Sequence, residues 1–213
     1  NENINIPEGV SLRGGYNPVT WERNLTTYPA IINTKEGINI ASGITSVILM
    51  NSNSSIDGVS IDARTLDIAV YTKNTSNISI RNSTISNCDI GIVLDSSSGD
   101  ISHNSIIGNR HSLSINNATN LLISKNSFYS TNLANKENIH LDNSTHVTFI
   151  NNLVTSGYAG IEISNLTNSI INHNAITKTL NYALELTNLN GCELTNNVFS
   201  ENNLGIVVNS AAP

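Results

Sequence analysis

The segment Ile171-Asn-His-Asn-Ala-Ile176 decides the fold, because nearly the same phrase returns along the chain at intervals of about 21–26 residues. Each copy places an asparagine between two apolar residues. A fixed period in this range is typical of solenoid proteins. An earlier copy, Ile80-Arg-Asn-Ser-Thr-Ile85, has Ser83 in the asparagine position. The repeated asparagines are Asn104, Asn126, Asn152, Asn174 and Asn197.

Each copy is followed by a short segment in which apolar residues alternate with other residues, such as Ile161-Glu-Ile163. Alternation over so few residues predicts a strand with one buried face. A further apolar pair, such as Leu121 and Ile123, leads into the next copy, so each repeat holds three short strands. No stretch has a sustained helical period. Such coils bury their apolar residues only by stacking, so we predict an all-β, single-stranded parallel β-helix of about 8–9 coils.

Stacked coils place the repeating asparagines directly above one another. Their side-chain amides can then hydrogen-bond from coil to coil, and asparagine also suits the tight corner in which each one lies. We therefore predict that these five asparagines form a structural ladder and not a binding site.

The chain divides into a first coil, a series of regular coils and a short tail. Residues 1–33 hold the first coil and a loop with Tyr16 and Trp21, the single tryptophan, which we expect to cap the open end of the core. Residues 34–209 hold the regular coils. Residues 210–213 form a tail without a polar capping unit, which a solenoid end requires. We therefore expect this end to lead into further sequence or to stack end to end on a partner.

The repeated phrase resembles the parallel β-helix repeat of the pectin-lyase-like superfamily, over roughly residues 40–209. The Gly14-Gly-Tyr16 and Trp21 elements are similar to openings of secreted bacterial β-helix proteins. The resemblance implies a right-handed coil and places the asparagine ladder between the second and third strands. The superfamily includes pectate lyases, polygalacturonases, phage tailspikes and non-enzymatic surface proteins, so this fold does not decide the function.

Composition narrows the classes of partner. The formal net charge is −6 and the ten lysines and arginines are spread along the chain, which argues against a nucleic-acid partner. No apolar run is long enough to span a membrane. A charged fraction of 12% and abundant Asn, Ser and Thr agree with a secreted or surface protein. We expect no cofactor.

One outward column of side chains is the candidate site. The predicted register stacks His140, Glu162 and Glu185 on consecutive coils, beside Asp142. Two carboxylates one strand spacing apart, about 5 Å, have the separation that retaining glycosidases use. However, any polar column on a solenoid satisfies this spacing. These columns also contain no Lys or Arg to abstract a proton, as a lyase requires, and no His pair has convincing metal-ligand spacing, so we expect no metal site.

We therefore predict a non-enzymatic extracellular role, as a rigid structural or adhesin module or as the subunit of a self-assembling filament. The alternative is a polysaccharide lyase, a glycosidase or a carbohydrate-binding module that uses the outward face of the first strand of each coil. Under this alternative, the catalytic candidates are Glu162, Glu185, Asp142 and His140, and the partner is a polysaccharide.

Overall fold

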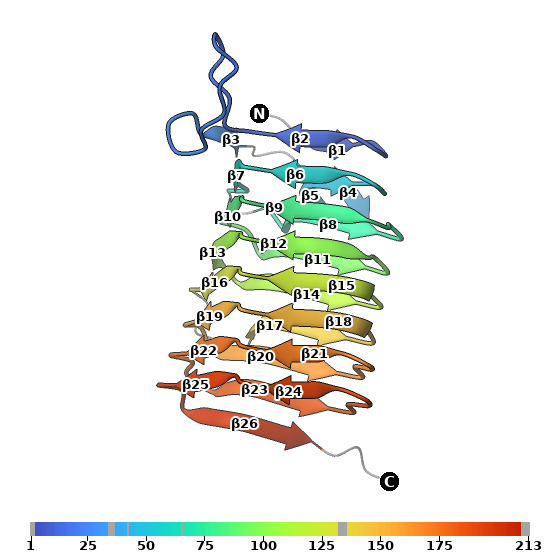
Figure 1. Cartoon of the computed structure of the whole chain (residues 1–213), viewed down its shortest axis with the longest axis vertical. Helices are drawn as coiled ribbons and strands as arrows, with labels where there is room; N and C mark the ends of the chain where they lie inside the picture. The colour runs from blue at the N-terminus through green and yellow to red at the C-terminus, as the bar shows by residue number, and fades with distance from the viewer. Residues whose placement is uncertain (1–2, 34–36, 42, 65, 132–135, 210–213) are drawn as a thin grey trace.

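The structure, a computed structural model, describes residues 3–33, 37–41, 43–64, 66–131 and 136–209. Within these ranges every regular element is a β-strand, and the strands stack into a rod of parallel coils (Figure 1). The predicted fold class, an all-β parallel solenoid with three strands per coil, is confirmed. The two residues before this range and residues 210–213, the predicted tail, lie outside the described residues.

The strands form three sheets that run along the rod. The first sheet contains, in stacking order, β1 (Ile4–Ile6), β5 (Ile44–Met50), β8 (Ile68–Lys73), β11 (Ile90–Asp95), β14 (His111–Asn116), β17 (Glu137–Asp142), β20 (Ala159–Ser164), β23 (Tyr182–Thr187) and β26 (Leu204–Asn209), and β4 (Ile38–Ala41) pairs antiparallel with β5. The second sheet contains β2 (Ser11–Arg13), β6 (Ser55–Asp57), β9 (Ile78–Arg81), β12 (Gly99–Ser102), β15 (Thr119–Ser124), β18 (Thr145–Ile150), β21 (Ile170–Asn172) and β24 (Glu193–Thr195). The third sheet contains β3 (Ala30–Asn33), β7 (Val59–Asp62), β10 (Thr84–Ser86), β13 (Ser105–Asn109), β16 (Ser127–Ser130), β19 (Leu153–Thr155), β22 (Ala175–Thr177) and β25 (Val198–Ser200).

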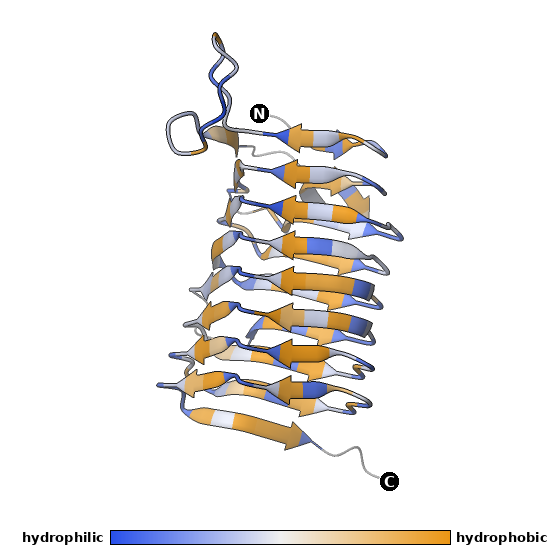
Figure 2. Ribbon diagram, viewed as in Figure 1, coloured by the Kyte–Doolittle hydropathy of each residue, from blue (hydrophilic) through white to orange (hydrophobic). Residues whose placement is uncertain are grey.

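The core lies inside the three sheets, where inward apolar side chains of successive coils pack on one another. In the second sheet, for example, Ile101, Ile123 and Phe149 are in register on consecutive strands and fully buried. The Phe128 and Phe149 rings stack with centroids 6.2 Å apart. Apolar residues gather on the strands and polar residues on the corners, as the alternating pattern predicted (Figure 2).

The asparagine ladder occupies the corner between the second and third sheets. The Asn152 side chain is typical: its Oδ1 accepts hydrogen bonds from the backbone N–H and the Nδ2 of Asn126, at 2.9 and 3.1 Å. Its Nδ2 donates to the Ile123 carbonyl and to Asn174 Oδ1, at 2.9 and 3.1 Å. These amides therefore satisfy polar backbone groups that are buried at the corner, which would otherwise cost free energy.

Asparagine also recurs at the exposed corner between the first and second sheets. Asn117, Asn143 and Asn165 have φ angles of 54°, 46° and 52°, in the left-handed region that asparagine tolerates better than most residues. The Asn188 Nδ2 donates to Asn165 Oδ1 at 3.0 Å, so this corner carries a second, exposed set of coil-to-coil bonds. The high asparagine content therefore follows from two kinds of corner.

Between β2 and β3 the chain leaves the first coil as a loop that projects from the rod (Figure 1). Asn17 holds the turn, since its Oδ1 accepts hydrogen bonds from the backbone N–H groups of Val19 and Thr20. The expectation that this loop caps the core needs correction, because Trp21 is 74% exposed. Arg23 reaches Asp57 on the next coil and so holds the loop to the side of the core. Trp21 therefore points away from the core.

The described part of the chain contains no helix with the length and apolar character that a membrane span requires. The predicted boundary between residues 33 and 34 lies beside residues 34–36, which are outside the described ranges. Beyond them, β4 and β5 form an antiparallel pair that the regular repeat did not predict.

Candidate functional site

The candidate site lies on the outward face of the first sheet, across β14, β17 and β20. In β17, Glu137 and His140 both contribute to this face, whereas Asn138 and Ile139 between them are fully buried. Two consecutive buried residues interrupt the ordinary alternation of a strand, so the outward side chains are three positions apart in sequence and not two. The same pair of buried positions recurs in β11, β14, β20 and β23, and in β17 it brings a glutamate and a histidine of one strand together.

Side chains from the neighbouring coils complete the arrangement, which we call the His–Glu cluster (His111, Glu137, His140 and Glu162). Glu137 Oε1 lies 3.5 Å from His111 Nδ1 and 3.7 Å from His140 Nδ1. His140 Nδ1 lies 3.8 Å from Glu162 Oε1. Ligand atoms of Glu137, His140 and Glu162 all lie within 4.8 Å of one another. Glu137 is only 9% exposed, so a carboxylate is held among imidazoles at the edge of the core.

Beyond Glu162, the same face continues onto β23. Glu162 and Glu185 are direct partners in the register of β20 and β23, as His140 and Glu162 are in β17 and β20. Glu185 Oε1 accepts a hydrogen bond of 2.6 Å from Asn209 Nδ2. The predicted column His140, Glu162 and Glu185 therefore exists as stacked neighbours.

Burial and charge shift the acid–base properties of this face. Burial raises the pKa of Glu162 above its ordinary value, and the charges of Glu137 and Glu185 add to this against the opposing effect of His140. Burial also lowers the pKa of His111, although the Glu137 carboxylate opposes the shift. The face thus gathers acidic groups whose mutual repulsion a proton or a cation would relieve.

The pKa values of two neighbouring groups, Tyr182 and Asp142, are shifted by different partners. Burial, followed by a hydrogen bond with Glu185, raises the pKa of Tyr182 above its ordinary value. Burial alone would raise the pKa of Asp142, but hydrogen bonds from Ser164 and Asn165 lower it below its ordinary value. The Asp142 carboxylate is therefore occupied by hydrogen bonds to residues of its corner, and its role differs from that of the other carboxylates.

The donor set of the His–Glu cluster suits a transition-metal ion. Imidazole nitrogens and carboxylate oxygens are ligands for Zn²⁺ and Cu²⁺, whereas Cu⁺ prefers thiolates and thioethers. The two cysteines lie elsewhere: Cys88 is buried at another corner, where burial raises its pKa to about 12, and Cys192 bonds to the Leu166 carbonyl. The cluster therefore fits Cu²⁺ or Zn²⁺ better than Cu⁺.

Glu137 and His111 are absent from the predicted site, because the sequence analysis followed only the simple alternation that makes His140, Glu162 and Glu185 outward. A signal was present, because small residues such as Gly91, Gly160 and Ala183 stand directly before the first inward residue of several strands. A Cβ on Gly160 would lie 2.2 Å from the Ala183 carbonyl oxygen, so this position faces a crowded interior. The residue at the position before it, which is Glu137 in β17, then lies on the other face of the strand.

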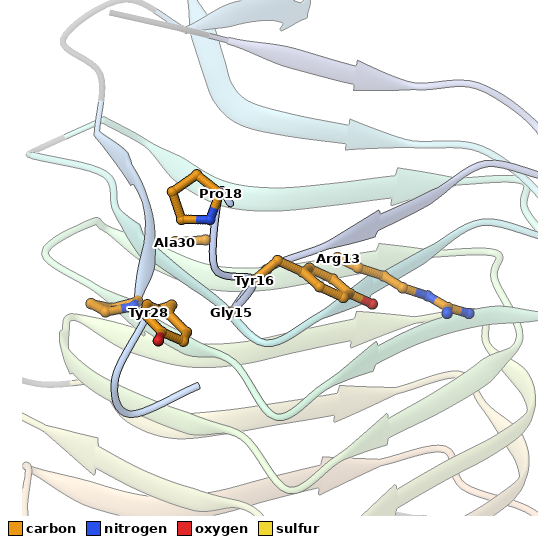
Figure 3. A pocket seen from close by; sticks show the side chains of 8 residues that line it. Arg13, Gly15, Tyr16, Pro18, Tyr28 and Ala30 are labelled. Atoms are coloured by element: carbon orange, nitrogen blue, oxygen red, sulfur yellow. The ribbon is translucent and has the colours of Figure 1, made fainter. Parts of the chain in front are cut away.

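Two surface hollows contain none of the residues of the His–Glu cluster, although Asp89 in the first accepts a backbone hydrogen bond from His111 at 2.8 Å. One is lined by Asn87, Cys88, Asp89 and Gly108. The other lies at the base of the projecting loop and is lined by Tyr16 and Tyr28, among others (Figure 3).

Comparisons with solved structures agree on the fold. The enzymatically active domain of tailspike protein 2 from bacteriophage CBA120 matches with a TM-score of 0.58 at 11% identity, over 93% of this chain and 33% of that chain. A DFA-IIIase mutant from Arthrobacter chlorophenolicus A6, in complex with DFA-III, matches with a TM-score of 0.51 at 12% identity, over 84% of this chain and 54% of that chain. This chain thus spans about a third to a half of the length of these proteins, and at such identities the likeness shows the fold alone.

Comparisons of sequence identify the family. None of the curated proteins matches the chain. The model of the family described as periplasmic copper-binding protein (NosD) matches residues 8–152 and, in a second alignment, residues 50–212. The periplasmic setting of that family supports an extracytoplasmic location for this chain. Because the repeat, the three-sheet solenoid and this match agree over most of the sequence, the chain belongs to the NosD family of β-helix proteins.

Proposed function

We propose that this protein binds a divalent transition-metal ion, Cu²⁺ foremost, outside the cytoplasm through Glu137, His140 and Glu162. The observation that carries the proposal is the convergence of their ligand atoms within 4.8 Å of one another on two adjacent strands. The description of the NosD family as copper-binding supports the choice of metal. Cu²⁺ also binds nitrogen and oxygen donors more tightly than the other divalent ions of its row.

Electrostatics favours a cation at this position. Burial and the charges of Glu137 and Glu185 raise the pKa of Glu162, which means that the ionised form is disfavoured there. A bound divalent ion would reverse this effect by attracting the carboxylates that now repel one another. His111 contacts Glu137 from the opposite side, so it can supply a further nitrogen or orient the Glu137 ligand.

The test is a titration of the metal-free chain with Cu²⁺ and with Zn²⁺ by calorimetry, with electron paramagnetic resonance on the Cu²⁺ complex. We expect one site, nitrogen hyperfine coupling from imidazole, and a loss of affinity of about 100-fold or more in a Glu137→Gln, His140→Gln double variant. His173→Gln and Glu193→Gln are matched controls, because both residues are exposed and lie on other surfaces. Unchanged Cu²⁺ affinity and unchanged hyperfine coupling in the double variant would refute the proposal.

A second candidate function is cleavage of a polysaccharide at the same face. The register pairing of Glu162 with Glu185 favours it, since one carboxyl has a raised pKa, as a general acid requires, beside a second carboxylate at strand spacing. The test is a panel of polysaccharides assayed for new reducing ends with the wild type, Glu162→Gln and Glu185→Gln. Activity that either substitution abolishes and Glu193→Gln preserves would support cleavage, and activity that survives both would exclude these residues.

The structural, adhesin and filament roles and the secreted or surface location remain predictions. Electron microscopy of the purified chain at rising concentration tests the filament role directly. Rods joined end to end would support it, and isolated rods at all concentrations would count against it.

A further inference from the structure

The base of the projecting loop forms a hollow of about 370 Å³, within the size range of small-ligand sites. Its lining combines two tyrosines and two prolines with an arginine and small residues (Figure 3). The lining residues are Arg13, Gly14, Gly15, Tyr16, Pro18, Tyr28, Pro29 and Ala30. The chain has few aromatic residues, 5% of its length, so two rings in one hollow are a local concentration.

Both rings are held in place by the loop. Tyr28 accepts a hydrogen bond of 2.8 Å at its hydroxyl from Asn17 Nδ2. The Arg23 guanidinium lies 5.7 Å from the centre of the Tyr16 ring, at cation–π distance. Arg23 Nε also donates to the Gly14 carbonyl at 3.0 Å. The hollow is therefore preorganised, which lowers the entropic cost of binding a ligand.

The surroundings of the hollow carry an excess of positive charge, although the whole chain is acidic. Asp57 is bound by Arg23, whose Nη2 lies 3.0 Å from Oδ1, and by Arg81, whose Nε lies 3.6 Å from Oδ2. Arg13 is the register neighbour of Asp57, but among the described residues it has no ion-pair partner. Two arginines thus bind the Asp57 carboxylate, and the third, Arg13, is the arginine that lines the hollow.

We propose that this hollow binds an anionic sugar residue, one that carries a carboxylate or a sulfate. Aromatic faces suit the apolar face of a sugar ring, and a guanidinium without a partner suits an anionic oxygen group, to which it can donate two hydrogen bonds. A neutral sugar would leave the surplus charge of Arg13 without a role. The inference does not rest on the metal site, because it uses none of the residues of the His–Glu cluster.

The experiment uses the full chain and the fluorescence of Trp21, the single tryptophan, which lies in the same loop. The probes are a hyaluronan tetrasaccharide, the neutral tetramer of N-acetylglucosamine and tetraglutamate. We expect the hyaluronan tetrasaccharide alone to bind, with an affinity that falls as salt rises. Arg13→Gln should weaken it about tenfold or more, because a charge-assisted hydrogen bond is lost, and Tyr16→Leu should do the same.

Arg64→Gln is the matched control, since Arg64 is an exposed arginine on another coil. Calorimetry replaces fluorescence if Trp21 does not respond to the probe. Equal binding of the neutral tetramer, or no loss in Arg13→Gln, would overturn the proposal. Equal binding of tetraglutamate would show a general anion or peptide site and would overturn it as well. If Tyr16→Leu disturbs the loop, Arg13→Gln decides the question alone.

Discussion

The asparagine ladder and the His–Glu cluster are built by the same stacking, but they use it in opposite ways. In the ladder, five consecutive coils contribute the same residue, and the amides of Asn126, Asn152 and Asn174 make the same bonds at every step. In the cluster, consecutive coils contribute different residues. Carboxylate oxygens of Glu137 and Glu162 lie 3.5 to 3.8 Å from histidine nitrogens, and these contacts do not form a repeating hydrogen-bond network.

This difference shows which columns of side chains in a solenoid contribute to stability and which are available for chemistry. Identical residues in a buried column satisfy one another and stabilise the stack. Different ionisable residues in an outward column shift the pKa values of one another and leave capacity for a ligand. We therefore expect substitutions in the ladder to affect stability and substitutions in the cluster to affect binding.

The largest effect is expected in the ladder. Asn152→Ala should lower the free energy of unfolding by about 3–4 kcal/mol, because buried groups of the neighbouring coil lose their partners at about 1–3 kcal/mol each. Among these groups are the backbone N–H of Asn126 and the carbonyl of Ile123. Urea denaturation at neutral pH measures the change. Thr148→Ala, on the outward face of the same coil, is the control, and an equal loss there would remove the distinction between the two regions.

A smaller effect is expected at the anchor of the projecting loop, which belongs to neither the ladder nor the cluster. Burial alone would raise the pKa of Asp57, but Arg23, Asn82 and Arg81 lower it below its ordinary value of 3.8. A carboxyl whose pKa is lowered in the folded state stabilises the fold at pH values above its ordinary pKa. This contribution is lost as the pH falls through the lowered pKa of the folded state. Asp57→Asn should therefore cost about 2 kcal/mol at neutral pH.

The same variant tests the sign of the pH dependence. The difference between the wild type and Asp57→Asn should shrink in urea denaturation series carried out below pH 3.8. Asp89→Asn removes an exposed carboxylate that pairs with Arg110, and should cost less than about 1 kcal/mol at any pH. A pH-independent loss in Asp57→Asn would mean that the ionic contacts of Arg23 are not what holds the loop.

The smallest effect on stability is expected in the cluster. Because the pKa of Glu162 is raised, its ionised form opposes folding, and this cost grows as pH rises through the folded pKa. Glu162→Gln should therefore leave stability unchanged or raise it by no more than about 0.5 kcal/mol at neutral pH, since the side chain is partly solvated. The gain in stability should vanish at pH values below 4.5, the ordinary pKa of the carboxyl. Thermal denaturation at two pH values measures it, and a clear loss of stability would contradict the proposed separation.

The sequence by itself determined the three strands per coil, the inward columns, the asparagine ladder and the stacking of His140, Glu162 and Glu185. These features follow from the repeat, because stacking brings equivalent positions of neighbouring coils together at a fixed spacing. Counting residues from one copy of the repeat to the next is then enough to name the neighbours.

Only the tertiary structure decided which side chains meet where a strand departs from simple alternation or where the loop folds back onto the rod. Glu137 reaches His140 because two consecutive residues of β17 are buried, and Arg23 joins Arg81 at Asp57 because the loop folds back onto the next coil. Trp21 faces solvent for the same reason. Such contacts depend on the local path of the backbone, which simple alternation and the period of the repeat do not give, and both proposed binding sites rest on them.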